Sequence, residues 1–143
     1  MSGYRGRFAP SPTGPLHLGS VLAACASWAD ARAAHGCWLV RIENLDPPRE
    51  QPGADRLILG LLDAIGLGSD EPVLYQSSRH AAYAAALQAL LSAGLAFECH
   101  CSRSDLAASG GIHRGVCVST NPASRPAAIR LRVPDLDVGF VDR

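Results

Sequence analysis

Four residues near the carboxyl-terminal end have the types and spacing of a metal site. Cys99 and Cys101 form a C-x-C pair, and after eleven intervening residues His113 and Cys117 form an H-x₃-C pair. Thiolates and imidazole are the ligands that tetrahedral zinc prefers. Because four ligands fill the coordination sphere, the spacing predicts a structural zinc site and not a catalytic one with an open position. The alternative is a set of free cysteines without metal.

The remaining cysteines and a nearby histidine favour other roles. His100 lies between Cys99 and Cys101. Consecutive side chains point apart in an extended segment, so we expect His100 to be an exposed bystander and only a weaker fourth-ligand candidate. Cys25 falls on an apolar helical face and Cys37 begins an apolar run, so both are expected in the core. The cysteine count of five is odd, and disulfides are not expected in a reducing compartment.

A second chemical feature is the segment 7–20, which reads Arg-Phe-Ala-Pro-Ser-Pro-Thr-Gly-Pro-Leu-His-Leu-Gly-Ser. Its prolines and glycines favour a loop that ends at the start of a helix. A helix N-terminus offers unpaired N–H groups and a partial positive charge, which suits phosphate. His17 can donate a hydrogen bond to a phosphate oxygen, and Gly19 allows a ligand to approach the backbone. The alternative is a connector with only a structural role.

The charge composition narrows the function further. All thirteen basic residues are arginine, and they balance thirteen acidic residues. A net charge near zero excludes a broadly basic nucleic-acid coat, although it leaves room for a local patch. The absence of lysine excludes a P-loop lysine, a Schiff base or a lysine general base on this chain. No run reaches about 18 apolar residues and the start lacks a signal-peptide core, so we expect a cytoplasmic protein without a membrane span.

Hydrophobic periodicity indicates the elements that must position these residues. Strands are predicted at 5–9, 37–42 and 73–75, helices around 18–29, 58–65 and 83–91, and a last strand at 128–133. Strands that alternate with helices predict an α/β fold with a parallel sheet. Residues 97–117 are rich in cysteine and glycine and show little periodicity.

The whole string from Pro10 to Ser20 resembles the first signature of the class I aminoacyl-tRNA synthetases, in its glutamate-specific form. Arg-Ile-Glu-Asn-Leu-Asp-Pro-Pro-Arg at 41–49 and Tyr-Gln-Ser-Ser-Arg at 75–79 are also similar to family segments. Two positions depart from the family pattern, with Ser20 in place of histidine and Asn44 in place of aspartate. The zinc segment resembles the insert of glutamyl-Q tRNA(Asp) synthetases, which often have tyrosine where His113 stands.

The resemblance implies a fold and a set of site residues. Residues 1–95 would form the first half of a Rossmann-like catalytic domain, and 96–143 a zinc-binding insert with a following strand. The glutamate pocket is assigned to Arg7, Phe8, Ala9, Pro10, Ser11 and Glu43. ATP binding is assigned to Pro12, Thr13, Gly14, His17 and Gly19, and catalysis to His17, Gly19 and Ser20. A guanidinium pairs with a carboxylate in bidentate geometry, so Arg7 would bind the glutamate side chain while Glu43 receives the α-ammonium group.

The implied reaction uses ATP with Mg²⁺ to activate glutamate, which then passes to queuosine in the anticodon of tRNA(Asp). A monomer is expected. The family also requires a second half of the nucleotide-binding fold with a lysine-bearing loop, and this chain has no lysine. We therefore expect a fragment, truncated product or split form with weak or absent activity by itself. The alternatives are a truncated discrete glutamyl-tRNA synthetase and a non-catalytic, zinc-stabilised module that binds nucleotide or tRNA.

Overall fold

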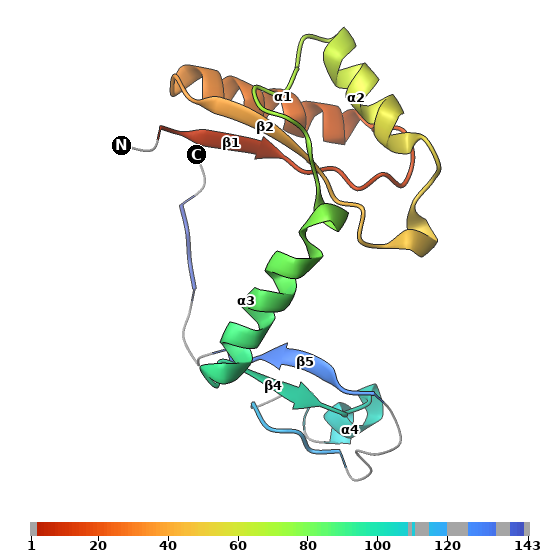
Figure 1. Ribbon diagram of the computed structural model, residues 1–143, viewed down its shortest axis with the longest axis vertical. Coiled ribbons are helices and arrows are strands. Elements are labelled where there is room, and N and C mark those ends of the chain that lie inside the picture. The colour runs from red at the N-terminus through yellow and green to blue at the C-terminus, as the bar shows by residue number, and fades with distance from the viewer. Residues whose placement is uncertain (1–2, 109, 111–114, 120–125, 134–137, 142–143) are drawn as a thin grey trace. The chain divides into compact units, whose positions relative to one another are not determined.

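The computed structural model describes residues 3–108, 110, 115–119, 126–133 and 138–141 (Figure 1). The chain forms two compact units, an N-terminal unit of Met1–His80 and a C-terminal unit of Ala81–Arg143. The domain boundary expected between residues 95 and 96 stays a prediction. Within the described ranges, every helix is too short or too polar to cross a membrane.

The N-terminal unit is built on a parallel sheet of three strands in the order β1-β2-β3. The strands are β1 (Arg5–Phe8), β2 (Cys37–Ile42) and β3 (Leu74–Tyr75), connected through α1 (Leu18–Ala33) and α2 (Ala54–Ala64). Short 3₁₀ turns follow β2 and β3 at Pro47–Arg49 and Gln76–Arg79. The predicted alternation and the parallel sheet are thus confirmed for this unit.

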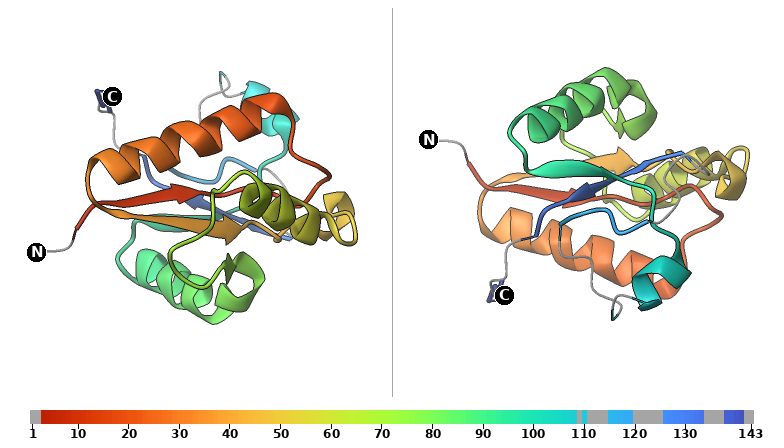
Figure 2. Two further views of the ribbon diagram at one scale, coloured as in Figure 1. Left: turned by 90° about the horizontal axis from the view of Figure 1, so that it is seen from above. Right: turned by 90° about the horizontal axis from the view of Figure 1, so that it is seen from below.

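The core of this unit lies on one face of β2. Trp38, Val40 and Ile42 alternate along the strand and are buried. They pack with Ala24 and Ala31 of α1 and with Ile58, Leu62 and Leu67 from α2 and the loop after it. Figure 2 shows α1 lying along β1 and β2. A strand between two others is expected to be apolar and continuous, which explains why the bounds of β2 were predicted correctly.

Helix α1 faces the sheet with only part of the apolar side that the sequence predicted, because Trp28 packs against the core and the leucines do not. Ala24 and Ala31 are fully buried, whereas Leu18 is 84% exposed and Leu22 is 67% exposed. Cys25 is also exposed, so its expected place in the core was wrong. The reason is the close approach of helix and strand at Gly6. A Cβ atom there would lie 3.1 Å from Ala31 Cβ, and only small side chains fit against it.

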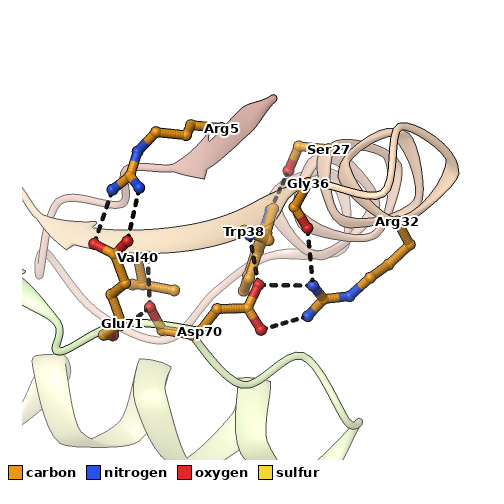
Figure 3. A network of polar contacts seen from close by, with 9 residues as sticks. Arg5, Ser27, Arg32, Gly36, Trp38, Val40, Asp70 and Glu71 are labelled. Atoms are coloured by element: carbon orange, nitrogen blue, oxygen red, sulfur yellow. Dashed lines mark hydrogen bonds and ion pairs between the residues drawn. The ribbon is translucent and has the colours of Figure 1, made fainter. Parts of the chain in front are cut away.

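Side chains of the loop after α2 complete the hydrogen bonding of β2 (Figure 3). The Trp38 N–H donates to Asp70 Oδ2 at 2.6 Å, and the Val40 N–H donates to Ser69 Oγ at 3.1 Å. Arg32 donates to both oxygens of Asp70, at 2.6 and 2.8 Å. These hydrogen bonds, with Arg32 first, hold the pKa of Asp70 at about 2. The loop therefore ties α1 to β2.

A second ion pair joins the same loop to β1. Arg5 donates to the two carboxylate oxygens of Glu71 at 2.7 and 2.8 Å. This bidentate contact lowers the pKa of Glu71. Both side chains are about half exposed (50% and 45%), so the pair contributes less to stability than its geometry alone suggests.

The C-terminal unit contains helix α3 (His80–Ser92), apart from its first residue, which the division assigns to the N-terminal unit. It also contains an antiparallel pair of strands, β4 (Ala96–Cys99) and β5 (Ala128–Leu131). The strand predicted at 128–133 is confirmed over Ala128–Leu131, two residues shorter than expected. β4 and a short helix α4 (Arg103–Ala108) lie where the sequence predicted irregular structure. Helix α4 starts at a local cap, because the Ser102 N–H donates to Asp105 Oδ2 and the Asp105 N–H donates to Ser102 Oγ. Both elements are too short for a periodic pattern.

Candidate functional site

The loop after β1 is fixed against the segment after β2 by backbone hydrogen bonds. The Glu43 N–H donates to the Pro10 carbonyl at 2.9 Å, and the Gln51 N–H donates to the Pro12 carbonyl at 2.9 Å. Pro10 and Pro12 are buried, while Ser11 and Thr13 between and beyond them are exposed. The structure thus brings together, at the carboxyl ends of two parallel strands, the segments predicted to bind glutamate and ATP. Ligands of open α/β sheets bind at this edge.

His17 caps the first turn of α1. The Ser20 N–H donates to His17 Nδ1 at 3.2 Å, and the Ser20 hydroxyl lies 3.0 Å from His17 Nε2. A Cβ atom at Gly19 would lie 3.1 Å from two atoms of the imidazole ring. The ring therefore folds back over Gly19, where a larger residue would displace it. His17, Gly19 and Ser20 lie together at a helix N-terminus, as the sequence predicted, and their catalytic role stays a prediction.

The residues predicted to bind glutamate differ in their surroundings. Arg7 is exposed on β1, with Leu39 as its partner in the register. Phe8 is half-buried and stacks on Trp38 with ring centroids 6.3 Å apart, which gives it a packing role as well. Glu43 accepts a hydrogen bond from Arg41 Nη2, a partner that sequence reasoning missed. A cation already beside Glu43 would compete with an ammonium group for its carboxylate.

Two further contacts connect the ends of β2 and β3. Asn44 Nδ2 donates to Ser77 Oγ at 2.8 Å, and the Ser77 N–H donates to Asn44 Oδ1 at 3.0 Å. The Tyr75 hydroxyl donates to Asp55 Oδ2 at 2.9 Å. Burial and the neighbouring carboxylate raise the pKa of Tyr75. Asn44, the departure from the family aspartate, therefore acts as a bridge between strand ends, through the donor that an aspartate lacks.

A cavity of about 370 Å³ lies beside these contacts. It is lined by Pro12, Ile42, Asn44, Pro47, Glu50, Gln51, Pro52, Gly53, Asp55 and Tyr75. Its two ionisable carboxylates, Glu50 and Asp55, favour ammonium and hydroxyl groups and disfavour a triphosphate. The cavity and the helix N-terminus at His17 therefore suit groups of opposite charge.

Three predicted metal ligands meet in the C-terminal unit. The sulfur atoms of Cys99, Cys101 and Cys117 all lie within 4.8 Å of one another, and those of Cys101 and Cys117 are 3.7 Å apart. Zinc–sulfur bonds of about 2.3 Å in a tetrahedron place sulfurs about 3.8 Å apart, so the spacing fits zinc. His113, the predicted fourth ligand, lies outside the described residues. Within the described residues the cluster does not include His100.

Backbone N–H groups point at the cysteine sulfurs. The His100 N–H donates to Cys117 Sγ at 3.3 Å, the Val118 N–H to Cys101 Sγ at 3.2 Å, and the Cys101 N–H to Cys99 Sγ at 3.4 Å. Donors from the His100 and Ser119 backbone lower the pKa of Cys117 to about 7. Burial raises the pKa of Cys101. These N–H donors favour the thiolate form of Cys117, and the thiolate is the form that binds metal.

Arg132, which sequence reasoning also missed, holds the loop that carries Cys117. Its guanidinium lies 4.8 Å from the centre of the Phe97 ring and donates to the Gly115 carbonyl, two residues before Cys117. The Arg132 N–H donates to the Leu95 carbonyl at 2.8 Å. The side chain thus links the two-stranded pair to the segment that bears the third sulfur.

Comparison with known proteins agrees with this arrangement. The family model of the catalytic domain of class I tRNA synthetases (E and Q) matches residues 4–132. A glutamate tRNA ligase from Elizabethkingia meningosepticum, solved in complex with its amino acid, superposes with a TM-score of 0.67 at 32% identity, over 78% of this chain and 25% of that one. The glutamate-tRNA synthetase of Elizabethkingia anophelis gives the same score and identity, over 78% and 26% of the two chains.

Sequence relatives are more similar still. The glutamyl-Q tRNA(Asp) synthetase of Xanthomonas campestris pv. campestris (strain 8004) is 63% identical over 131 residues, which are 92% of this chain and 43% of that protein. The protein of that name from Pseudomonas putida (strain GB-1) is 54% identical over 142 residues, or 99% and 48%. The chain thus spans less than half the length of these relatives. It belongs to the class I tRNA synthetases of the E and Q type, through their catalytic domain.

Proposed function

We propose that the N-terminal unit binds glutamate and ATP and contributes to the activation of glutamate for transfer to tRNA. The observation that carries this proposal is the pair of backbone bonds that hold the loop after β1 against the segment after β2. They support a site with Arg7 and Glu43 at neighbouring strand ends. The relatives whose names contain glutamate or glutamyl support the same substrate.

The proposed reaction joins glutamate to AMP. A carboxylate oxygen at C1 of glutamate attacks the α-phosphorus of ATP, and the bond to the bridging oxygen breaks to release pyrophosphate. Arg7 binds the side-chain carboxylate and Glu43 receives the α-ammonium group once Arg41 releases it. His17 and the N–H groups of the first turn of α1 stabilise negative charge on the phosphates. Mg²⁺ accompanies ATP as part of the substrate.

The acceptor that we propose is queuosine in the anticodon of tRNA(Asp). The support is the level of identity, which is 54–63% to the glutamyl-Q tRNA(Asp) synthetases and 32% to the glutamate tRNA ligases of known structure. The alternative is a discrete glutamyl-tRNA synthetase. Transfer of labelled glutamate to tRNA(Asp), and not to tRNA(Glu), would favour the first.

For the C-terminal unit we propose one structural zinc ion. Cys99, Cys101 and Cys117 would hold it, with His113 as the fourth ligand. The ion would cross-link β4 to the segment around Cys117 and supply no step of the reaction.

The experiment that tests the catalytic proposal is glutamate-dependent exchange of pyrophosphate into ATP. The chain has no lysine, so its N-terminal site would bind a triphosphate without a lysine ammonium group. We therefore expect the 143-residue chain to bind glutamate and to exchange weakly or not at all. Robust exchange by the purified chain would contradict the expected weakness, and failure to bind glutamate would contradict the site.

A non-catalytic binding module is the second candidate. The absence of lysine favours it for this chain, because no lysine ammonium group is present to neutralise the leaving pyrophosphate. Calorimetry that detects ATP or glutamate binding without turnover would support it. Turnover after the chain is joined to the remaining part of a relative would favour the enzyme.

A further inference from the structure

Cys101 and Cys117 form a close sulfur pair within the cysteine cluster. Their Sγ atoms lie 3.7 Å apart. The backbone beside each cysteine donates to the sulfur of the other, since the His100 N–H donates to Cys117 Sγ at 3.3 Å and the Val118 N–H donates to Cys101 Sγ at 3.2 Å. These reciprocal hydrogen bonds join the two segments without passing through a metal. They therefore keep the two sulfurs close at the moment when a metal leaves.

The three cysteines of the cluster differ in their exposure to solvent. Cys117 is exposed, Cys101 is half-buried, and Cys99 is only 2% exposed. A small oxidant that arrives from solvent therefore reaches Cys117 first. The sulfur that lies 3.7 Å from it belongs to Cys101, and a disulfide needs the two sulfurs to approach to about 2.05 Å, which rotation of a side chain can supply. Cys101 and Cys117 thus combine access with proximity.

We propose that Cys101 and Cys117 are a reversible oxidation site, with hydrogen peroxide as the oxidant. The Cys117 thiolate attacks one peroxide oxygen, the O–O bond breaks, and a sulfenic acid and hydroxide are formed. The Cys101 thiolate then attacks the Cys117 sulfur, which forms the disulfide and releases a second hydroxide. Two electrons pass from the two sulfurs to the peroxide. The disulfide removes two of the proposed zinc ligands, so that a bound Zn²⁺ is released.

The disulfide and the proposed zinc ion cross-link the same two segments. The oxidised unit would lose its metal and keep a covalent bond between the segment after β4 and the segment around Cys117. This inference rests on the geometry of the sulfur pair and goes beyond the proposed function, so its test does not depend on activity. The metal-free chain contains the same pair. Failure of the oxidation site and failure of the zinc site can therefore be told apart.

Peptide mapping after oxidation tests the proposal. Trypsin releases Cys101 together with Cys99 in the peptide 80–103, and Cys117 in the peptide 115–130, in which an Arg-Pro bond resists cleavage. The 143-residue chain, zinc-loaded and metal-free, is treated with hydrogen peroxide, alkylated with N-ethylmaleimide and digested. In both forms we expect the two peptides to be cross-linked, and fragmentation of the product to place the bond at Cys101 and the alkyl group at Cys99. The yield should not depend on protein concentration, because both sulfurs belong to one chain.

Zinc release and two variants complete the test. A chromophoric chelator should record about one zinc released per zinc-loaded chain, in step with the cross-link, and dithiothreitol should reverse the cross-link. Cys117→Ser should abolish the cross-link, whereas Cys99→Ser, which removes the third sulfur and leaves the pair, should keep it. A bond at Cys99 in wild type, oxidation of Cys117 to a sulfinic acid without a cross-link, or complete alkylation of both cysteines after peroxide would overturn the proposal. A cross-link in a chain that never bound zinc would contradict the zinc site alone.

Discussion

The two candidate sites of this molecule are supported by their surroundings in different ways. The first, which we call the strand-end site, consists of the loop after β1 and the segment after β2. It is held by backbone hydrogen bonds and by a core that includes Trp38, Ile42 and Ile58, all fully buried. The cysteine cluster lies in a unit where the buried apolar residues, within the described ranges, are Ala96 and Cys99. A site on a packed sheet is formed before its ligand binds. A site with so little core would depend on a bound metal for stability.

Removal of zinc should therefore cause the largest loss of stability, and only in the C-terminal unit. Structural zinc in small domains contributes on the order of 10 kcal/mol. We expect about one zinc per chain, and Cys99→Ser should abolish it, with loss of amide protection in β4 and β5 but not in β1 and β2. Metal analysis together with hydrogen exchange measures both. Unchanged zinc content in Cys99→Ser would show that the ligand assignment is wrong.

Gly36→Ala should destabilise the N-terminal unit and spare the cysteine cluster. A Cβ atom at Gly36 would overlap the backbone oxygen of Tyr4, which accepts the Cys37 N–H at 3.0 Å. Because backbone cannot move aside cheaply, we expect a loss of about 3 kcal/mol in the free energy of unfolding. Denaturant titration followed by tryptophan fluorescence measures this, because Trp28 and Trp38 both lie in the N-terminal unit. Gly60→Ala on α2, where a Cβ meets nothing within 4 Å, is the matched control.

Arg132→Ala should weaken zinc binding without removing a ligand. The side chain holds the loop through the Gly115 carbonyl, and partners of this kind change metal affinity by about tenfold or more. Competition with a chromophoric chelator measures the affinity. Arg130→Ala, which removes a neighbouring arginine of β5, is the control. Equal zinc affinities in wild type and Arg132→Ala would mean that the loop is held by the metal alone.

The smallest effect is expected from acid titration of the N-terminal unit. The pKa of Asp70 is about 2 in the folded chain and lies near 3.9 in an unfolded one. A lowered carboxyl pKa stabilises the fold above about pH 4, and this contribution is lost as the pH falls toward 2. Asp70→Asn should flatten the dependence of stability on pH within that window. An unchanged pH profile in Asp70→Asn would assign the acid sensitivity to another carboxylate.

The sequence predicted what depends on local pattern. The apolar run at 37–42 and the loop signals around it were sufficient for β2, and the cysteine spacing was sufficient for the cluster. The sheet-facing side of α1 could be predicted only in part, because two sides of the helix carry apolar residues and the choice depends on Gly6 of a distant strand. The Arg41–Glu43 ion pair and the hydrogen bond from Arg132 to the Gly115 carbonyl likewise depend on side-chain rotamers and tertiary contacts. A periodic sequence pattern does not predict either.

The most direct test of the central claim is titration of the chain with L-glutamate, followed by amide chemical shifts. We expect shifts concentrated in residues 7–19 and 41–53, much weaker binding of L-glutamine, and loss of binding in Arg7→Gln. Arg5→Gln removes the same charge from the same strand, at a side chain that pairs with Glu71, and should bind as wild type. Equal binding of glutamine, or undiminished binding by Arg7→Gln, would contradict the assignment of the strand-end site.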